Sequence, residues 1–149
     1  MSIEFEIKQS QFRNDRQRAL INIIYTHNYL INQLNTVFKK YKITRQQYNV
    51  LRIIRGAHPA PVTINDIKER MLDKMSDASR IVDRLKAKGL IQRTQSPHDR
   101  RSVEVRITKE GLRFLDVTDP EVEKFDLLFS NLEGEEVETL NLLLDKIRT

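Results

Sequence analysis

The chain has 149 residues, of which 32 % are charged and 39 % hydrophobic, and it contains no cysteine. This length suits one domain or one subunit of a small oligomer, and no stretch approaches the roughly 18 consecutive apolar residues of a membrane helix. The lack of cysteine excludes disulfides, thiolate metal sites and a cysteine redox sensor. Because the N-terminus has no apolar signal segment, we expect a cytoplasmic protein.

The net charge of +5 is distributed unevenly along the chain. Residues 1–60 hold ten Lys and Arg against three Asp and Glu, residues 61–113 hold thirteen against eight, and residues 114–149 hold three against ten. A basic body with an acidic end is typical of a protein that faces a polyanion on one side. Solvated surface helices of uneven charge explain the same counts, so both interpretations stay open at this point.

Apolar residues recur at a spacing of three and four between about Gln9 and Tyr41, and this period predicts one long helix. At a rise of about 1.5 Å per residue, the helix would span roughly 45–50 Å. That is long for a subunit of this size. We therefore expect part of its apolar stripe to pack against a second chain.

The next helix is predicted to begin at Thr44, which forms the sequence signature of a capping box with Gln47. Gly56 suits the end of this helix. Pro59 and Pro61 then block regular pairing, so the segment around them is predicted to be a loop or a short edge strand.

Two short helices are predicted to follow, joined by a four-residue connection. Thr63 is placed to cap the first of them, and Leu72–Lys74 have the composition of the turn. Ser76 is placed to cap the second helix, which Gly89 is expected to end.

Leu90–Thr94 and Val103–Ile107 are strand-like, and the second alternates apolar with charged residues. The polar residues Ser96–Asp99 form the turn between them. These segments predict a two-stranded ribbon directly behind the second short helix.

The last third of the chain is predicted to be helical. One helix is expected from about Thr108 to Val117, and Asp119 and Pro120 match the cap and first position of another. Glu135–Arg148 has the spacing of a final helix. Both ends of the chain would expose apolar surface in a monomer, so we predict a homodimer built from the terminal helices.

The helix that follows Ser76 has a polar outer face, because the apolar residues between Ala78 and Leu85 recur on one side. In a helix-turn-helix, the N-terminal half of such a helix enters the major groove, where Arg bonds guanine and Ser bonds base edges or phosphates. Asp77 can accept from a cytosine amino group or position Arg80, while Arg84 is placed to meet a phosphate. An ordinary surface helix of mixed charge is the alternative. The predicted DNA-contacting residues of this helix are Ser76, Asp77, Ser79, Arg80 and Arg84.

The turn of the ribbon carries Asp99, Arg100 and Arg101, which we predict to be the DNA-binding residues of a β-wing. A narrow minor groove concentrates negative potential and attracts an inserted Arg. Asp99 is expected to hold the Arg101 side chain in an extended pose through a charge-assisted bond. A solvated, charged hairpin tip is the alternative.

The segment from Asp77 to Gly111 resembles the multiple antibiotic resistance regulator (MarR) family of winged-helix transcription factors. The family pattern is a recognition helix ending in (V)-D-R-L-x-x-K-G-L, a D-x-R wing tip and a strand that closes on L-T-x-x-G. Here Val82–Leu85 and Lys88–Leu90 match the helix, Asp99–Arg101 the tip, and Ile107–Gly111 the strand end.

The resemblance implies a two-fold dimer with winged lobes, with Arg101 in the minor groove and the helix at Ser76–Arg84 in the major groove. Regulators of this family commonly repress genes and release DNA when a small, often aromatic, effector binds. Aromatic residues at helical spacing are also typical of a core, and His27 is either an interface histidine or a pH-sensitive group. The residues that would line an effector crevice are Tyr25, His27, Tyr29, Phe38, Tyr48 and Arg52.

These features predict a mainly α fold with a small β-wing (α+β), that is, a winged helix-turn-helix flanked by dimerisation helices. Residues 1–42 are predicted to form the N-terminal dimerisation helix, residues 43–113 the DNA-binding domain and residues 114–149 the C-terminal dimerisation helices. The expected partners are double-stranded DNA, a second copy of the chain and a small aromatic effector, with no membrane.

No nucleophile–base set and no glycine-rich phosphate loop is evident, so we predict neither an enzyme nor a cofactor. The three histidines lack the paired spacing of a zinc site, so no metal is expected. We predict a sequence-specific DNA-binding transcriptional regulator, a ligand-responsive repressor acting as a homodimer on a pseudo-palindromic operator. The alternative is a winged-helix module that binds protein or RNA without operator specificity.

Overall fold

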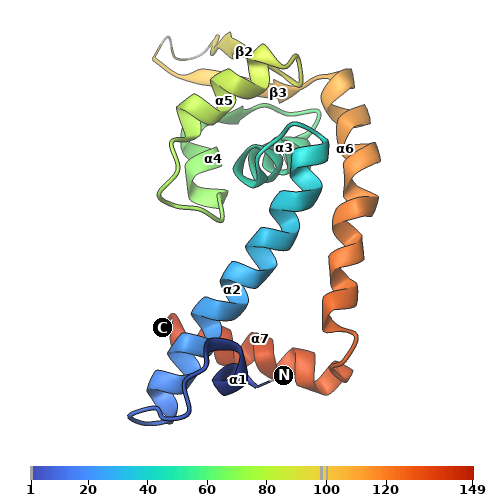
Figure 1. The fold of residues 1–149 in the computed structure, drawn as a ribbon. Coiled ribbons are helices and arrows are strands. Elements are labelled where there is room, and N and C mark those ends of the chain that lie inside the picture. The colour runs from blue at the N-terminus through green and yellow to red at the C-terminus, as the bar shows by residue number, and fades with distance from the viewer. Residues whose placement is uncertain (1, 98, 100) are drawn as a thin grey trace. The chain divides into compact units, whose positions relative to one another are not determined.

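The chain forms two compact units, one reaching to Arg45 and the other comprising Gln46–Thr149 (Figure 1). The computed structural model describes residues 2–97, 99 and 101–149. The predicted functional boundaries, at residues 42/43 and 113/114, stay predictions. Among the described residues, no helix has both the length and the apolar character needed to cross a membrane.

The first unit contains a short helix α1 (Ile3–Ile7) and a long helix α2 (Asp15–Lys40). The prediction that the long helix begins near Gln9 is wrong, because Asn14 accepts a hydrogen bond from the backbone N–H of Gln17 at 2.9 Å and caps the helix there. Its 26 residues correspond to about 39 Å.

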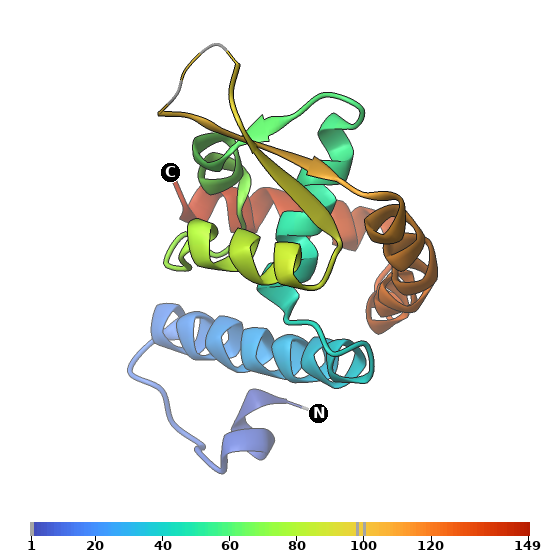
Figure 2. The ribbon, with the colours of Figure 1, turned by 90° about the horizontal axis from the view of Figure 1, so that it is seen from above.

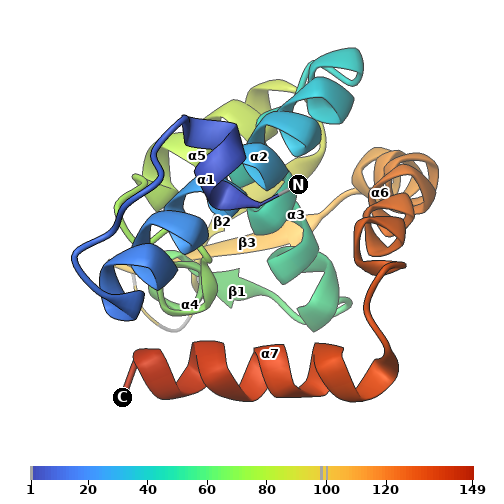
Figure 3. The ribbon, with the colours of Figure 1, turned by 60° about the horizontal axis from the view of Figure 1, so that its bottom comes forward.

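Two polar contacts join α1 to α2 within this unit. The guanidinium of Arg18 pairs with Glu4 at 2.6 Å, and the hydroxyl of Tyr25 donates to Glu6 at 2.9 Å. Figure 3 shows α1 lying beside α2. The short helix α1, which the periodicity of α2 does not reveal, is therefore held to α2 by an ion pair and a hydrogen bond.

The second unit begins with three helices packed beneath a small sheet (Figure 2). The helices are α3 (Arg45–Ala57), α4 (Ile64–Arg70) and α5 (Ala78–Ala87), and the strands are β1 (Val62–Thr63), β2 (Ile91–Gln95) and β3 (Val103–Ile107). The strand order is β1–β3–β2 and both pairings are antiparallel. The predicted ribbon is confirmed, and of the two alternatives for the proline-containing segment, a loop or a short edge strand, its end forms the strand.

The core of this winged lobe, residues 46–113, draws large side chains from all three helices and from the sheet. Leu51, Ile67, Leu85 and Val105 are fully buried and come from α3, α4, α5 and β3. The predicted cap at Thr63 is confirmed, since its hydroxyl accepts from the N–H of the third helical residue at 3.1 Å within a reciprocal capping box.

The rest of the chain forms α6 (Lys109–Glu123), the 3₁₀-helix η1 (Lys124–Phe129) and α7 (Gly134–Ile147). The prediction that Asp119 and Pro120 begin a new helix is wrong, because α6 continues through both residues. The Asp119 carboxylate accepts hydrogen bonds from α3 instead of capping a helix, and these bonds hold this turn against the lobe. The predicted final helix is confirmed, and the mainly helical fold with a small sheet agrees with the expected class.

Candidate nucleic-acid interface

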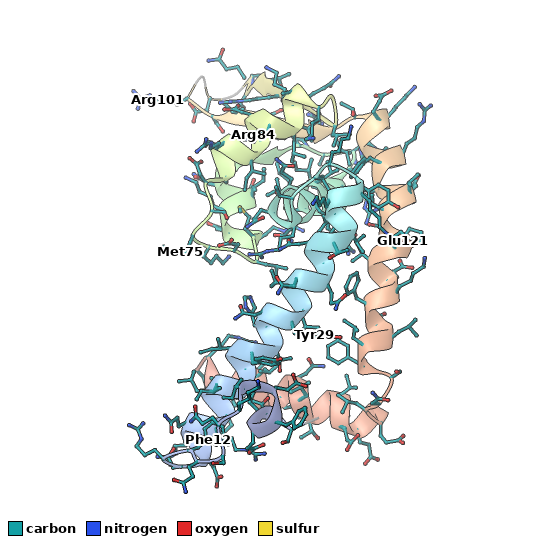
Figure 4. All side chains as sticks on the ribbon, in the orientation of Figure 1. Phe12, Tyr29, Met75, Arg84, Arg101 and Glu121 are labelled. Atoms are coloured by element: carbon teal, nitrogen blue, oxygen red, sulfur yellow. The ribbon has the colours of Figure 1, made fainter. Side chains whose placement is uncertain are left out.

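Helix α5 lies in the lobe with the phase that its sequence predicts. Ala78, Ile81, Val82 and Leu85 are buried, and Arg80 and Arg84 are exposed. Figure 4 shows Arg84 on α5. Within the described part of the chain, neither guanidinium makes an ion pair with a carboxylate. Both arginines therefore remain available to a polyanion.

The N-terminus of α5 is set by Asp77 and not by Ser76, so the predicted cap is wrong by one residue. Oδ1 of Asp77 accepts from the backbone N–H of Arg80 at 3.1 Å and satisfies one of the donors left open by the first helical turn. The negative charge also faces the positive end of the helix. Ser76 lies half-buried in the preceding turn, and Ser79 is half-buried in the first turn of α5.

The connection between α4 and α5 comprises seven residues, Met71–Asp77, where four were predicted. The Lys74 ammonium donates to two carbonyl oxygens in the last turn of α4, where a cation is favoured by the helix dipole. The backbone N–H of Leu72 donates to the side chain of Asn49 on α3 at 3.1 Å. The bond from Leu72 to Asn49 joins residues that are far apart in sequence, so no local pattern reveals it.

The wing is the β2–β3 hairpin, and its loop is closed by backbone hydrogen bonds from Ser96 and Ser102, both at 2.9 Å. Asp99 accepts from the backbone N–H of Arg101 at 2.9 Å, so the predicted bond to the Arg101 guanidinium is corrected to a bond to its backbone. Arg101 is exposed at the far end of the hairpin (Figure 4). Arg100, also predicted to bind DNA, lies outside the described residues.

The wing is tied to α5 and to the loop before β1 by two arginines that sequence reasoning missed. Arg93 of β2 pairs with Asp83 of α5, which neutralises the carboxylate on the outer face of that helix. Arg106 of β3 donates to the carbonyl oxygen of Pro59 at 2.8 Å. The wing and α5 therefore form one connected surface. The exposed Arg80 and Arg84, which pair with no carboxylate of the described residues, give this surface positive charge.

The glycines of the K-G-L and T-x-x-G motifs meet in space. The Thr108 hydroxyl donates to the carbonyl oxygen of Gly89 at 2.7 Å and accepts from the N–H of Gly111 at 3.0 Å. Gly89 has φ of 73°, in the left-handed region, and a Cβ on Gly111 would lie 2.2 Å from the carbonyl oxygen of Leu90. Through these contacts the motif residues join α5, the wing and α6, with Gly111 buried and Gly89 exposed.

Two of the predicted effector residues, Tyr48 and Arg52, belong to a polar cluster between α3 and α6. The Tyr48 hydroxyl donates to Oδ1 of Asp119 at 2.6 Å, and Arg55 donates to Oδ2 at 2.5 Å. The Arg52 guanidinium lies 5.9 Å from the centroid of the Tyr48 ring. The phenol of Tyr48 is therefore already bonded within the protein.

The same contacts change the acidity of two members of this cluster. Burial, followed by the hydrogen bond to Asp119, raises the pKa of Tyr48 to about 12. Burial alone would raise the pKa of Asp119, but the hydrogen bonds from Tyr48 and Arg55 outweigh it and the pKa is lowered. The carboxylate and the neutral phenol are thus the stable pair at neutral pH.

The other predicted effector residues lie on α2 in the first unit. Tyr25, His27 and Tyr29 are exposed and Phe38 is buried. Because these four residues and the pair on α3 belong to different units, a shared effector crevice stays a prediction. The described residues contain no group of three or more His, Asp or Glu side chains arranged to hold a metal ion.

Comparison with known proteins places this geometry among transcriptional regulators. The model of the MarR family matches residues 41–102. The multiple antibiotic resistance protein MarR of Salmonella typhimurium is 33 % identical over 126 residues, covering 80 % of this chain and 86 % of that protein. The transcriptional regulator PecS of Dickeya dadantii is 29 % identical over 92 % of this chain and 88 % of its own length.

The fold is also similar to that of solved structures. A mutant MarR from E. coli complexed with operator DNA superimposes with a TM-score of 0.79 at 29 % identity, covering 93 % of this chain and 99 % of that one. The small sheet and the helices α3 to α5 therefore correspond to a winged-helix arrangement.

Proposed function

Because the chain belongs to the MarR family of DNA-binding transcriptional regulators, we propose that it is a ligand-responsive repressor that acts as a homodimer on a pseudo-palindromic operator. Its relatives are named transcriptional regulators, and the chain is not an enzyme. The proposal adds the sign of regulation, the oligomeric state and the response to an effector to the shared DNA-binding activity.

The observation that carries the proposal is a pair of exposed arginines on α5, Arg80 and Arg84, which meet no carboxylate among the described residues. Arg80 lies in the first turn, the part of a recognition helix that approaches base edges, so it is assigned to a guanine. Arg84 lies one turn further along and is assigned to a phosphate. Arg101 at the hairpin end is assigned to the neighbouring minor groove.

The exposed apolar residues of the terminal helices support the dimer. Leu20 and Ile24 on α2 are more than half exposed, as are Leu143 and Ile147 on α7. An exposed apolar stripe on a helix usually marks an interface. A two-fold dimer requires half-sites about one helical turn (~10 bp), or a multiple of it, apart.

The test is a fluorescence-anisotropy titration of a duplex selected by the protein from a random pool, beside a scrambled duplex, at two salt concentrations. The wild type should prefer the selected duplex, and salt should weaken both complexes. Arg80→Ala should cost about 1–3 kcal/mol and relax specificity at one base position. Arg84→Ala should weaken all duplexes nearly equally, with a smaller salt slope.

The matched control is Arg113→Ala, which removes an exposed arginine from α6 and should change neither quantity. A uniform loss for Arg80→Ala across sequences would overturn its base-reading role. Equal weak binding of both duplexes by the wild type would instead favour a winged-helix module that binds protein or RNA.

The effector is tested on the same complex. A small aromatic acid or phenol that releases the selected duplex should lose its effect when residues of the predicted crevice, such as Tyr29, are replaced by Ala. Release that persists in every such variant would place the effector elsewhere.

A further inference from the structure

Helix α6 is attached to the winged lobe at two separate places. At its first turn, Gly111 packs against the carbonyl oxygen of Leu90 so closely that a Cβ would lie 2.2 Å from that atom. Further along, Asp119 accepts hydrogen bonds from Tyr48 and Arg55 of α3. The two attachments are eight residues apart, or about 12 Å along the helix axis.

Two attachments on one rigid helix determine its direction, whereas a single attachment would leave it free to pivot. Leu115 and Thr118, which lie between the two places, are fully buried, so the helix is also packed along this length. Beyond Asp119, α6 leads through η1 to α7 (Figure 1). The second attachment therefore controls the angle at which the C-terminal helices leave the lobe.

We propose that Tyr48, Arg55 and Asp119 form a positioning joint that fixes the direction of α6 and thereby the separation of the two recognition helices in the dimer. The joint rests on the proposed function, because it matters only if two lobes bind one operator. None of its three residues is assigned to DNA.

The required precision shows why such a joint would matter. A lobe of about 70 residues is roughly 30 Å across, so a rotation of about 10° displaces its far edge by about 5 Å. This displacement exceeds the rise of one base pair, about 3.4 Å. A loosened joint would consequently move α5 out of register with its half-site.

The contacts suit this role because they are directional and partly shielded from solvent. The side chains of Arg55 and Asp119 are 28 % and 19 % exposed, so water and salt screen their pair less than a surface pair. Tyr48 is 6 % exposed and adds a neutral hydrogen bond to the other carboxylate oxygen. Both oxygens of one carboxylate are thus held from α3.

A positioning joint and a merely stabilising contact predict different DNA binding. Binding of the second lobe is intramolecular, and its effective concentration depends on geometry. Loosening the joint should therefore weaken a duplex with two half-sites while leaving a duplex with one half-site unchanged. A loss of folded protein would weaken both duplexes equally.

The experiment compares the wild type with Tyr48→Phe and Asp119→Asn on duplexes carrying one half-site, two half-sites, or two half-sites moved apart by one or two base pairs. Both variants should bind the two-site duplex about tenfold more weakly, bind the one-site duplex within about twofold of the wild type, and tolerate altered spacing better. Arg55→Lys, which keeps the charge, should bind the two-site duplex more tightly than Arg55→Ala.

The matched control is Glu110→Gln, which breaks an exposed ion pair within the first turn of α6 and does not touch α3. It should behave as the wild type on all duplexes. Equal losses on one-site and two-site duplexes, or an unchanged spacing preference, would overturn the joint. If the wild type itself does not distinguish the selected duplex from a scrambled one, this result overturns the proposed function and, with it, the proposed joint.

A second readout measures the separation directly. The chain has no cysteine, so Glu69→Cys on the exposed surface of α4 places one spin label on each lobe of the dimer. The label-to-label distance distribution should be narrow in the wild-type background and broad with Tyr48→Phe or Asp119→Asn. Distributions of equal width would reject the joint independently of DNA binding.

Discussion

The winged lobe and helix α7 bury their apolar residues to very different extents. In the lobe, Leu51, Ile54, Ile67 and Leu85 are fully buried by contacts within one chain. In α7 no residue is buried, although the helix carries the same kind of apolar stripe. The lobe thus completes its own core, whereas α7 presents a stripe that a single chain leaves in water.

The contrast shows how one short chain can use one region to recognise DNA and another to form the dimer. Because the core of the lobe is complete, polar residues on the outer face of α5 can serve DNA binding without lowering the stability of the fold. The exposed apolar face of α7 is unfavourable in the monomer, and burying it favours the dimer. Substitutions in the two regions should therefore change different measurements.

The largest effect is expected for Gly111→Ala, which disrupts the close packing of the winged lobe. The new Cβ would lie 2.2 Å from the carbonyl oxygen of Leu90 and 2.7 Å from Cγ1 of Ile107, so backbone must move. We expect a loss of about 3 kcal/mol in the free energy of unfolding, measured by urea denaturation. Gly134→Ala, at a site with no atom within 4 Å, is the control and should not destabilise the protein. An unchanged midpoint for Gly111→Ala would refute the close packing.

The next largest effect is expected for Leu143→Glu, which places a charge in the exposed apolar stripe of α7. Leu143 is 54 % exposed, so the monomer should accept the charge, whereas an apolar interface should not. We expect a monomer by sedimentation, normal helicity by circular dichroism and about 100-fold weaker operator binding, or about 2.7 kcal/mol. Asn141→Glu puts the same charge on an exposed polar position of α7 and should remain dimeric. A dimeric Leu143→Glu protein would place the interface elsewhere.

A smaller effect should distinguish the contribution of Asp77 to stability from its contribution to DNA recognition. Asp77→Ala removes the N-cap and should lower the free energy of unfolding by about 1 kcal/mol. Asp77→Asn keeps an acceptor at the cap and should restore most of this stability. If Asp77→Asn is stable but selects a different base at one operator position, Asp77 also reads DNA. Equal instability of both variants would show that the cap is not the source of the effect.

The smallest effect is a pH dependence that Tyr48 should introduce at high pH. Its pKa is about 12 in the folded protein and about 10 when unfolded, so its stabilisation is complete below pH 10 and is lost as the pH rises toward 12. At pH 10.5, the wild type should have lost somewhat less than about 1 kcal/mol relative to Tyr48→Phe. Parallel stability curves for the two proteins between pH 9 and 11 would contradict the shifted pKa.

Predictions made from local patterns were confirmed where the structure depends on neighbours in sequence. The inner face of α5 follows from its period, the cap at Thr63 from its reciprocal partner three residues later, and the end of α5 from Gly89. Family membership was likewise indicated by the motifs between Asp77 and Gly111. The assignment of individual side chains to bases and phosphates stays a prediction.

Predictions failed where a partner distant in sequence decides the outcome. Asp119 and Pro120 have the local signature of a helix start, but Tyr48 and Arg55 bind the carboxylate and α6 continues. The α4–α5 connection is longer than expected, and Asn49 of α3 holds it through the backbone N–H of Leu72.

By itself, the sequence determined the period and the charge of the elements and the cap at Thr63, because these depend on residues within one or two turns. The tertiary structure decided which polar groups were already bonded and which remained free. Asp83 is paired across the lobe with Arg93, whereas Arg80 and Arg84 meet no carboxylate among the described residues. The physical reason is that a hydrogen bond or ion pair depends on distance in space, and only the fold brings these distant residues within a few ångströms.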